Sequence, residues 1–433
     1  MHSTGSSPTR MITEAADGAS SGRVLIVGLN YVPEPTGIAP YTTGLAEGLA
    51  RDGAPVRVIA GFPHYPQWRV QDGYSGRTMR ETIAGVPVTR LRHYVPSAPR
   101  LLDRLVLELG FGLRALTARW GRPDVVLLVS PALFSTGLAG LRARLTGVPH
   151  CVWVQDIYTL GVAESGTGGR LAGRALASVE RSILRSADRV VVIHDRFKRY
   201  LVEDLGVDAD RVEVVRNWSH VDESPAFSRT GTRERLGWGR DDVVVLHAGN
   251  MGAKQGLENV VHASQLAAER GSRVRFVLLG DGNRRAALEA LGGNAALDFV
   301  DPLPDEEFTA ALHAADVLLV NERPGLTEMS VPSKLTSYFS SGLPVIAATD
   351  AASVTAEELA RSRAGVRVDA ADPAALLAAA EAMAADPESA AAYGRAGRAF
   401  RAAYLSEHSA IAAFSAILDD VMSPTAEPAP SAR

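Results

Sequence analysis

The chain opens its regular pattern with an apolar run of strand length at residues 23–28, followed by a loop containing prolines and a glycine. Residues 39–51 carry apolar side chains at helical spacing, and residues 56–60 form a second apolar run. Short apolar runs without polar alternation are typical of strands buried on both faces of a parallel sheet. The order strand, loop, helix, strand therefore predicts the opening of a doubly wound α/β sheet.

The same alternation continues to residue 218, pauses, and starts again. The first series predicts further strands at 125–129, 150–154, 189–193 and 212–215. The second predicts strands at 243–247, 273–279, 316–320, 344–348 and 365–368, followed by an Ala-rich helical segment from 373 to about 421. Residues 219–240 are polar and rich in proline and glycine, which predicts a connection. We therefore expect two doubly wound parallel sheets whose strand carboxyl ends border a ligand cleft.

Composition supports this organisation and narrows the classes of function. The 433 residues are 46% hydrophobic and 22% charged, which is enough apolar material for two cores. The net charge of −4 gives no sign of the basic surface that a general nucleic-acid binder needs. The single cysteine, Cys151, allows no internal disulfide and is expected to be a small buried residue, which favours a reducing, cytoplasmic compartment.

The two ends of the chain and its longest uncharged stretch give no targeting signal. Residues 1–21 are rich in Ser, Gly and Thr without an apolar core, so they predict a disordered extension rather than a signal peptide. Residues 422–433 are rich in Pro and Ala and are expected to be disordered. The stretch 125–141 is interrupted by Pro131 and Gly137 and predicts strand, turn and helix rather than a membrane span.

A nicotinamide dinucleotide enzyme also has two such domains, but the glycine patterns do not favour one. The loop after the first strand runs from Gly28 to Gly37 with prolines at 33 and 35, so it lacks the G-x-G-x-x-G fingerprint. In the second domain, the Gly-x-x-Gly of residues 249–252 and the Gly-Asp-Gly of 280–282 do not complete that fingerprint. The chain also has no P-loop.

Two segments of the second domain predict phosphate binding. Pro332 and Ser333 open a helix, and such an end offers unpaired N–H groups to a phosphate, to which Lys334 adds a full charge. The glycine-rich segment 249–256, with Lys254, lies between a strand and a helix and allows backbone to approach a diphosphate. A capped helix with a surface lysine and an ordinary loop are the simpler interpretations. However, these are two of only three lysines in the chain.

Loops after three strands of the first domain carry polar and aromatic side chains. The segment 30–41 would place Glu34 and the Gly37 backbone in the cleft, and the segment 61–68 would place His64 there to stack on or bind a sugar. Asp156 follows a third strand. The alternatives are a rigid structural loop, a packed aromatic loop and a helix cap, respectively.

Residues 90–122 are rich in arginine and contain two acids, Asp103 and Glu108. An apolar stripe recurs along a predicted helix in this segment at Leu101, Leu105, Leu109, Leu113 and Leu116. A basic amphipathic helix suits docking to an anionic membrane leaflet. A core-facing helix with a solvated arginine face is the alternative interpretation.

Taken together, these residues resemble the family-4, GT-B-fold, retaining glycosyltransferases, in particular the branch of colanic-acid and O-antigen transferases. The resemblance rests on Asn-Tyr-Val-Pro-Glu at 30–34, Gly-Phe-Pro-His-Tyr-Pro at 61–66, Gly-Asn-Met-Gly at 249–252 and Val-Pro-Ser-Lys-Leu at 331–335. It extends from about Val24 to Leu418. It implies a cytoplasmic enzyme, peripheral on the inner membrane face, that moves a sugar from a UDP- or GDP-linked donor to a polyprenyl-linked or other surface-polysaccharide precursor.

The resemblance also assigns roles to domains and residues. Residues 22–218 would bind the acceptor, residues 241–400 would bind the nucleotide sugar, and a helix at 401–421 would pack back on the first domain. The expected diphosphate-binding residues are Gly249, Asn250, Gly252, Lys254, Gln255, Ser333 and Lys334. The expected nucleoside-binding residues are Gly280, Asp281, Gly282 and Leu303. The expected cleft and acceptor residues are Asn30, Tyr31, Glu34, Gly37, Tyr41, His64, Tyr65 and Asp156.

The chain departs from the broad family pattern at four charged positions. Asn250 and Gln255 stand where the family has Arg and Lys, and Met329 and Ser337 stand where it has two glutamates. We therefore predict a relocated set of charges, in which Lys334 and Lys254 neutralise phosphate. Glu322 or Glu328 would then contact the donor sugar. The candidate catalytic residues are Lys334, Glu322, Glu328 and His64.

The expected chemistry uses no metal or other cofactor. We identify no Asp-x-Asp metal-binding motif in the chain, and helix N–H groups with lysines can stabilise a leaving diphosphate by electrostatic preorganisation. Two other functions remain open: a GT-B nucleotide-sugar epimerase, which has no acceptor, and a sugar-nucleotide-binding protein without activity, which the missing glutamates would permit.

Overall fold

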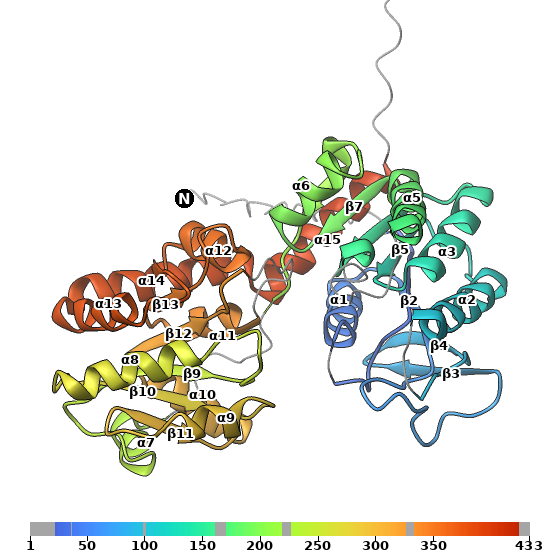
Figure 1. Ribbon diagram of the computed structural model, residues 1–433. Helices are drawn as coiled ribbons and strands as arrows, with labels where there is room; N and C mark the ends of the chain where they lie inside the picture. The colour runs from blue at the N-terminus through green and yellow to red at the C-terminus, as the bar shows by residue number, and fades with distance from the viewer. Residues whose placement is uncertain are drawn as a thin grey trace, which may run out of the picture.

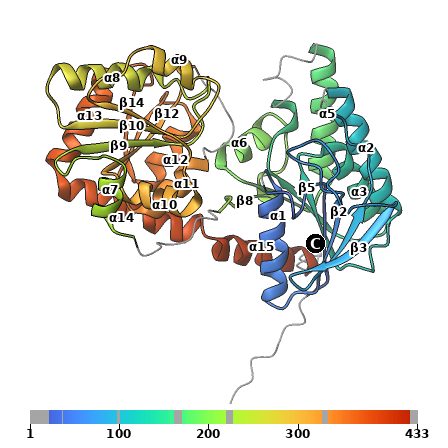
Figure 2. The same ribbon diagram turned by 90° about the horizontal axis from the view of Figure 1, so that it is seen from below.

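The computed structural model describes residues 22–35, 37–97, 101–160, 170–218, 227–325 and 333–423. The chain forms two α/β lobes that stand side by side in both ribbon views (Figure 1 and Figure 2). Each lobe contains one largely parallel sheet with helices on both faces. The predicted fold class of two doubly wound parallel-sheet domains is therefore confirmed.

The N-terminal lobe is built on an eight-stranded sheet in the order β3-β4-β2-β1-β5-β6-β7-β8. Its strands are β1 (Val24–Gly28), β2 (Val56–Gly61), β3 (Thr78–Ile83), β4 (Val86–Leu91), β5 (Val125–Ser130), β6 (His150–Val154), β7 (Arg189–Val192) and β8 (Val212–Val214). Every residue of β1, β5 and β6 is buried. Helices cover both faces of these strands, which explains why they appear in the sequence as continuous apolar runs.

The edge hairpin of β3 and β4 was not predicted from the sequence. The two strands are antiparallel, and Ala84 and Gly85 between them both have positive φ, as a tight hairpin turn requires. Residues of β3 alternate between exposed and half-buried, because this strand lies at the edge of the sheet. Its charged residues, such as Arg80 and Glu81, hide the strand from a search for apolar runs.

Helices of the N-terminal lobe form two layers. Among the described residues they are α1 (Ala39–Arg51), α2 (Leu101–Thr117), α3 (Leu133–Leu145), α5 (Arg170–Ser186), α6 (Asp195–Glu203) and the 3-10 turn η1 (Ala209–Arg211). Phe111 of α2, Ala139 of α3 and Leu184 of α5 belong to the core on one face of the sheet. Leu45 of α1 belongs to the core on the other face.

The last helix of the chain, α15 (Glu407–Met422), completes the core beneath α1 (Figure 2). The ring centroid of its Phe414 lies 4.8 Å from that of Trp153 on β6. A Cβ at Gly48 of α1 would lie 2.0 Å from Ile411 Cδ1, so glycine at this position lets the two helices approach. The chain therefore passes from the first lobe to the second and back again.

The C-terminal lobe is built on a parallel six-stranded sheet in the order β11-β10-β9-β12-β13-β14. Its strands are β9 (Val243–Ala248), β10 (Val274–Leu279), β11 (Leu297–Val300), β12 (Val317–Asn321), β13 (Val345–Ala348) and β14 (Gly365–Val368). Its helices are α7 (Arg229–Arg235), α8 (Glu258–Glu269), α9 (Arg285–Ala290), α10 (Asp305–Ala314), α11 (Ser333–Ser341), α12 (Val354–Ser362), α13 (Pro373–Ala385) and α14 (Pro387–Tyr404).

Two of these helices differ from the boundaries expected from the sequence. Helix α7 lies within the predicted connection 219–240, and its Arg229 and Arg233 both pair with Asp316 of the C-terminal lobe. Helix α14 continues past residue 400, so the segment that returns to the first lobe begins with α15. In the described parts of the chain, no helix is both long and apolar enough to cross a membrane.

Helix α2 exposes an apolar face. It buries Leu107, Phe111 and Ala115 against the sheet. Large apolar side chains on its outer face have exposed fractions of 74% at Leu102, 53% at Val106, 36% at Leu109 and 55% at Leu113. Leu109 and Leu113 belong to the predicted stripe, so the core-facing interpretation of that stripe is wrong for these two residues. Helix α3 packs along α2 and adds Leu141 and Leu145, which are also exposed.

Candidate active site

The glycine-rich segments 249–256 and 280–282 meet at the carboxyl edge of the C-terminal sheet, because they follow the neighbouring strands β9 and β10. The Gly249 N–H donates to the Leu279 carbonyl at 2.8 Å. A Cβ at Gly280 would lie 2.1 Å from the Gly249 carbonyl oxygen, so this close approach requires glycine. The structure thus brings together the residues predicted to bind the diphosphate and the nucleoside.

Two neutral side chains shape the first of these loops. Gln255 Oε1 accepts a hydrogen bond from the Gly252 N–H at 3.0 Å, and a Cβ at Gly252 would lie 2.8 Å from Asn250 Nδ2. Gln255 therefore stabilises the loop without adding charge, and the neutral side chain of Asn250 lies beside Gly252. Lys254 is exposed on the same loop, and its carbonyl accepts the Arg323 N–H at 2.8 Å.

The Lys334 ammonium reaches the same edge from the first turn of α11. Its Nζ lies 2.9 Å from His247 Nε2 and 3.8 Å from the place where a Cβ on Gly249 would stand. Burial lowers the pKa of Lys334 to about 8, while the carboxylate of Glu322 acts in the opposite direction. A positive charge partly withdrawn from water therefore lies over the Gly249 backbone, on the first turn of α11, where an α-helix leaves its N–H groups without partners inside the helix.

Glu322 is held at the end of β12 with its carboxylate occupied. Its two oxygens accept hydrogen bonds from the hydroxyls of Thr349 and Thr355. Glu328 and Met329 lie outside the described residues. Of the residues in the predicted relocated set of charges, the structure describes Lys334, Lys254 and Glu322. Ser333 is the first residue of α11, next to Lys334.

Of the predicted nucleoside-binding residues, Gly280, Asp281 and Gly282 form the second glycine loop, and Leu303 follows the neighbouring strand β11. The Asp281 carboxylate accepts a hydrogen bond from the Gly282 N–H at 2.7 Å, and Asp281 is exposed. Leu303 is half-buried and packs against the core of the C-terminal lobe. Contact of these residues with a base or a ribose stays a prediction.

In the N-terminal lobe, Glu34 is buried and joins two loops. Its Oε1 accepts the His64 N–H at 2.7 Å and the Tyr65 N–H at 2.8 Å, and its Oε2 accepts Asn30 Nδ2 at 2.8 Å. Contrary to expectation, Glu34 does not project into an open cleft, because three N–H groups hold its carboxylate inside the protein. It fixes the loop at 30–37 against the loop at 61–68.

The imidazole of His64 is also buried. Its Nδ1 lies 3.0 Å from the Phe62 carbonyl, and its ring centroid lies 4.8 Å from that of His93. The pKa of His93 is lowered to about 3, mainly by burial and to a smaller extent by the neighbouring His64. A catalytic role for His64 therefore requires a movement of the surrounding loop, and it stays a prediction.

The other candidates in this lobe differ in their exposure. Tyr31 is buried, and the Arg90 guanidinium lies 5.4 Å from its ring centroid. Tyr41 is half-buried, with its ring edge against Trp218 at a centroid distance of 5.3 Å. Gly37 and Asp156 are exposed and Tyr65 is half-buried. Contact of these last three residues with an acceptor stays a prediction.

The two lobes meet through a buried ionic cluster that sequence reasoning missed. Glu358 of α12 accepts Arg216 Nε at 2.9 Å, and its other oxygen lies 3.2 Å from His194 Nε2. Asp195 pairs with the same guanidinium at 2.5 Å. His194 follows β7 and α12 follows β13. The contact therefore joins the carboxyl edges of the two sheets.

The charges of this cluster stabilise one another. Burial alone would raise the pKa of Glu358, but the hydrogen bond with His194 and the Arg216 charge outweigh it, so its pKa lies below its ordinary value. Little in the sequence marks the cluster, because Glu358 lies 142 residues from Arg216 and 164 residues from His194. Only the polar residues His194 and Asp195 directly after an apolar strand give a local signal.

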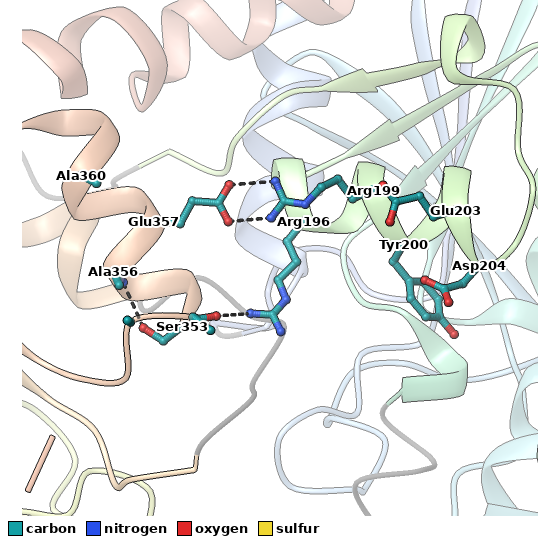
Figure 3. Close-up of a pocket in the computed structure, with 11 residues that line it drawn as sticks. Arg196, Arg199, Tyr200, Glu203, Asp204, Ser353, Ala356, Glu357 and Ala360 are labelled. Carbon is teal, nitrogen blue, oxygen red and sulfur yellow. Dashed lines mark hydrogen bonds and ion pairs between the residues drawn. The ribbon is translucent and has the colours of Figure 1, made fainter. Parts of the chain in front are cut away.

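Beside this cluster, α6 and α12 border an open groove of about 680 Å³ (Figure 3). Arg199 binds Glu357 through two hydrogen bonds of 3.0 and 2.8 Å, and Arg196 donates to the Ala352 carbonyl at 2.9 Å. None of the candidate site residues lines this groove. Within the described ranges, no group of three or more His, Cys, Asp or Glu residues is arranged to hold a metal ion.

Family models match both lobes. A glycosyl transferase 4-like domain matches residues 36–218, and a glycosyl transferases group 1 domain matches residues 242–386. The chain is 34% identical over 338 residues to the putative colanic acid biosynthesis glycosyl transferase WcaI of Escherichia coli, covering 74% of this chain and 81% of that one.

Two further proteins extend the comparison. The chain is 30% identical over 334 residues to the GDP-mannose-dependent alpha-mannosyltransferase of Mycobacterium tuberculosis, covering 75% of this chain and 78% of that one. Its fold matches that of Anabaena HepE, solved in complex with UDP-glucose, with a TM-score of 0.62 and 14% identity over 92% of this chain and all of that one.

The junction cluster yields a stability prediction. Replacing Glu358 by glutamine should lower the melting temperature by several degrees at pH 7, because removing one partner of a buried ion pair costs roughly 3–5 kcal/mol. Since its pKa is lowered in the folded protein, this contribution is complete above the unfolded pKa of about 4.3 and is lost as the pH falls through the folded value.

The neighbouring residue supplies the control for this experiment. Glu357→Gln removes the exposed pair with Arg199 and should cost about 0–1 kcal/mol. Thermal melting followed by circular dichroism measures both variants. Equal effects of the two substitutions would contradict the importance assigned to the buried cluster.

Proposed function

Because the chain belongs to the GT-B glycosyltransferases that combine a glycosyl transferase 4-like domain with a group 1 domain, we propose that it transfers a sugar from a nucleoside diphosphate sugar to a surface-polysaccharide precursor. The observation that supports this most directly is the meeting of two glycine loops and the Lys334 ammonium at one sheet edge. Backbone N–H groups and a buried cation together suit a diphosphate.

The leaving group dictates what this edge does during transfer. The bond between the anomeric carbon and the diphosphate oxygen breaks, and the acceptor hydroxyl forms the new bond and releases its proton. Negative charge grows on the departing diphosphate, and Lys334, with the N–H groups at the start of α11, stabilises it. Because these groups are fixed by the fold, they supply this stabilisation without a metal ion. We propose retention of the anomeric configuration because the sequence resembles retaining glycosyltransferases.

The two lobes divide the substrates between them. We propose that the donor sugar is contacted by Glu322, whose carboxylate acts on Lys334, or by Glu328. The acceptor would bind the N-terminal lobe at Asp156, Gly37 and Tyr65. A GDP- or UDP-linked donor agrees with the name of the Mycobacterium tuberculosis relative, which includes GDP-mannose, and with the UDP-glucose bound in the HepE structure. The name of the Escherichia coli relative supports a polysaccharide precursor as the acceptor.

The exposed face of α2 fits an anionic lipid surface, where a polyprenyl-linked acceptor would be anchored. Four adjacent apolar side chains face outward on this helix, and α3 adds two more. Arg92 and Arg119, which flank the helix in sequence, are exposed, while Glu108 is buried and adds no surface charge. An apolar face with basic surroundings binds in the plane of an anionic bilayer.

Nucleotide binding tests the site on the C-terminal lobe. UDP, GDP, ADP and TDP are screened by thermal shift with and without Mg²⁺. One of them should raise the melting temperature equally in both conditions, because a ligand at 100 times its Kd adds about 2.7 kcal/mol. Lys334→Met should lower the affinity for that nucleotide at least about tenfold, which corresponds to 1.4 kcal/mol of binding free energy.

Lys198→Met on α6 is the matched control, since it removes a lysine outside the candidate site and should leave binding unchanged. Wild-type protein that responds to none of the four nucleotides would overturn the proposed function. Conversion of the sugar nucleotide without transfer to an acceptor would instead indicate an epimerase.

Membrane docking is tested with vesicles. Replacing Val106 and Leu113 together by glutamine should reduce binding to phosphatidylglycerol vesicles at least about tenfold, because each side chain loses roughly 1.5–3 kcal/mol of apolar burial. Replacing Leu291 and Tyr404, which are exposed on the other lobe, by glutamine should have no effect. Cosedimentation measures both, and equal binding of both double variants and the wild type would refute docking through α2.

A further inference from the structure

His247 is a buried polar residue beneath the candidate diphosphate site, and it is absent from the residues expected from the sequence. It lies on β9, two residues before Gly249, and none of its surface is exposed. Its Nε2 lies 2.9 Å from Lys334 Nζ on α11. The contact therefore joins the strand that leads into the first glycine loop to the helix that carries the cation.

The protonation state of this pair follows from its surroundings. Burial, and after it the positive charge of Lys334, lowers the pKa of His247 well below its ordinary value. Backbone groups at Asn250 and Leu319 act in the opposite direction but do not compensate. The imidazole is therefore neutral, and its Nε2 lone pair accepts a hydrogen from the Lys334 ammonium while Nδ1 carries the proton.

A neutral acceptor has a particular consequence at this position. A carboxylate in the same place would orient Lys334 but would also cancel its charge and compete with an incoming anion. The imidazole orients the ammonium and leaves the charge in place. Glu322 is the carboxylate whose charge acts on Lys334, yet its own oxygens are occupied by the hydroxyls of Thr349 and Thr355.

The geometry also limits where the ammonium lies. Lysine side chains have several rotatable bonds, and fixing one of them costs conformational entropy. The contact with His247 fixes the Lys334 side chain before a ligand binds, and it holds Nζ 3.8 Å from the position of a Cβ on Gly249. A cation already fixed against the glycine loop binds a diphosphate without a further ordering cost.

We propose that His247 is a positioning residue, which holds the Lys334 ammonium against the glycine loop in readiness for the diphosphate of the sugar nucleotide. This inference rests on the proposed function and adds a residue to it. It assigns His247 no contact with the substrate. Its effect must therefore pass entirely through Lys334, and it must concern only the diphosphate part of the ligand.

Two amides of different reach test this role. Glutamine places an oxygen near the position of Nε2, whereas asparagine is one methylene shorter and does not reach Lys334. His247→Asn should lower the affinity for the nucleoside diphosphate at least about tenfold, and His247→Gln should restore most of the lost affinity. The probe is whichever of UDP, GDP, ADP and TDP binds the wild type, measured by calorimetry beside its own nucleoside. The nucleoside affinity should be the same in all three proteins.

A double-mutant cycle separates positioning from general damage. In a Lys334→Met background, His247→Asn should cause no further loss of affinity for the nucleoside diphosphate, because the lysine through which His247 acts is gone. Where the asparagine variant does not fold, His247→Leu takes its place, since it removes the acceptor without burying a new polar group.

Three results would overturn the inference. They are an equal loss of nucleoside and nucleotide affinity, an additive loss in the double variant, and a His247→Asn protein that binds the nucleotide like the wild type. In each of them the wild type still binds, so the proposed sugar-nucleotide site survives. A wild type that binds none of the four nucleotides refutes that site, and the role of His247 falls with it.

Discussion

The buried contact of Glu358 with Arg216 and His194 fixes how the two lobes of this protein meet. Either sheet alone would present loops at its carboxyl edge, but the ionic cluster joins those edges at β7 and β13. Charged groups are withdrawn from water only where they satisfy one another, and here each oxygen of Glu358 has a partner from the other lobe. Together with the return of α15 to the first lobe, the cluster sets the relative position of the two proposed substrate sites.

The buried charged residues of the protein fall into two groups: those that hold the structure together and those that can bind a ligand. Glu34 and Glu358 are fully occupied by N–H groups of the protein itself, so they fix loops and lobes. Lys334 is different, because its neighbour His247 is neutral and leaves the ammonium with its charge. A partly buried cation beside glycine backbone suits a ligand that brings its own negative charge, which is why the proposed function centres on a diphosphate.

The sequence predicts those parts of the fold whose signal is local. Buried strands such as β1 and β5 are continuous apolar runs, and the two glycine loops directly follow β9 and β10. Both the sheets and the candidate diphosphate site could therefore be predicted. The β3–β4 hairpin could not, since an edge strand carries charged residues. The roles of Glu34, His247 and Glu358 depend on partners 30 to 164 residues away, and no local pattern reports such distances. Whether α2 exposes its apolar stripe was left open by the sequence, because periodicity shows a stripe but not which side of the helix meets the core.

A crystal structure of the protein with the nucleoside diphosphate that it binds would test the central claim most directly. The account predicts phosphate oxygens within hydrogen-bonding distance of Lys334 Nζ and of backbone N–H groups in the loop 249–256, with the base beside residues 280–282. A nucleotide bound in the groove between α6 and α12, or anywhere with its phosphates away from Lys334, would contradict it.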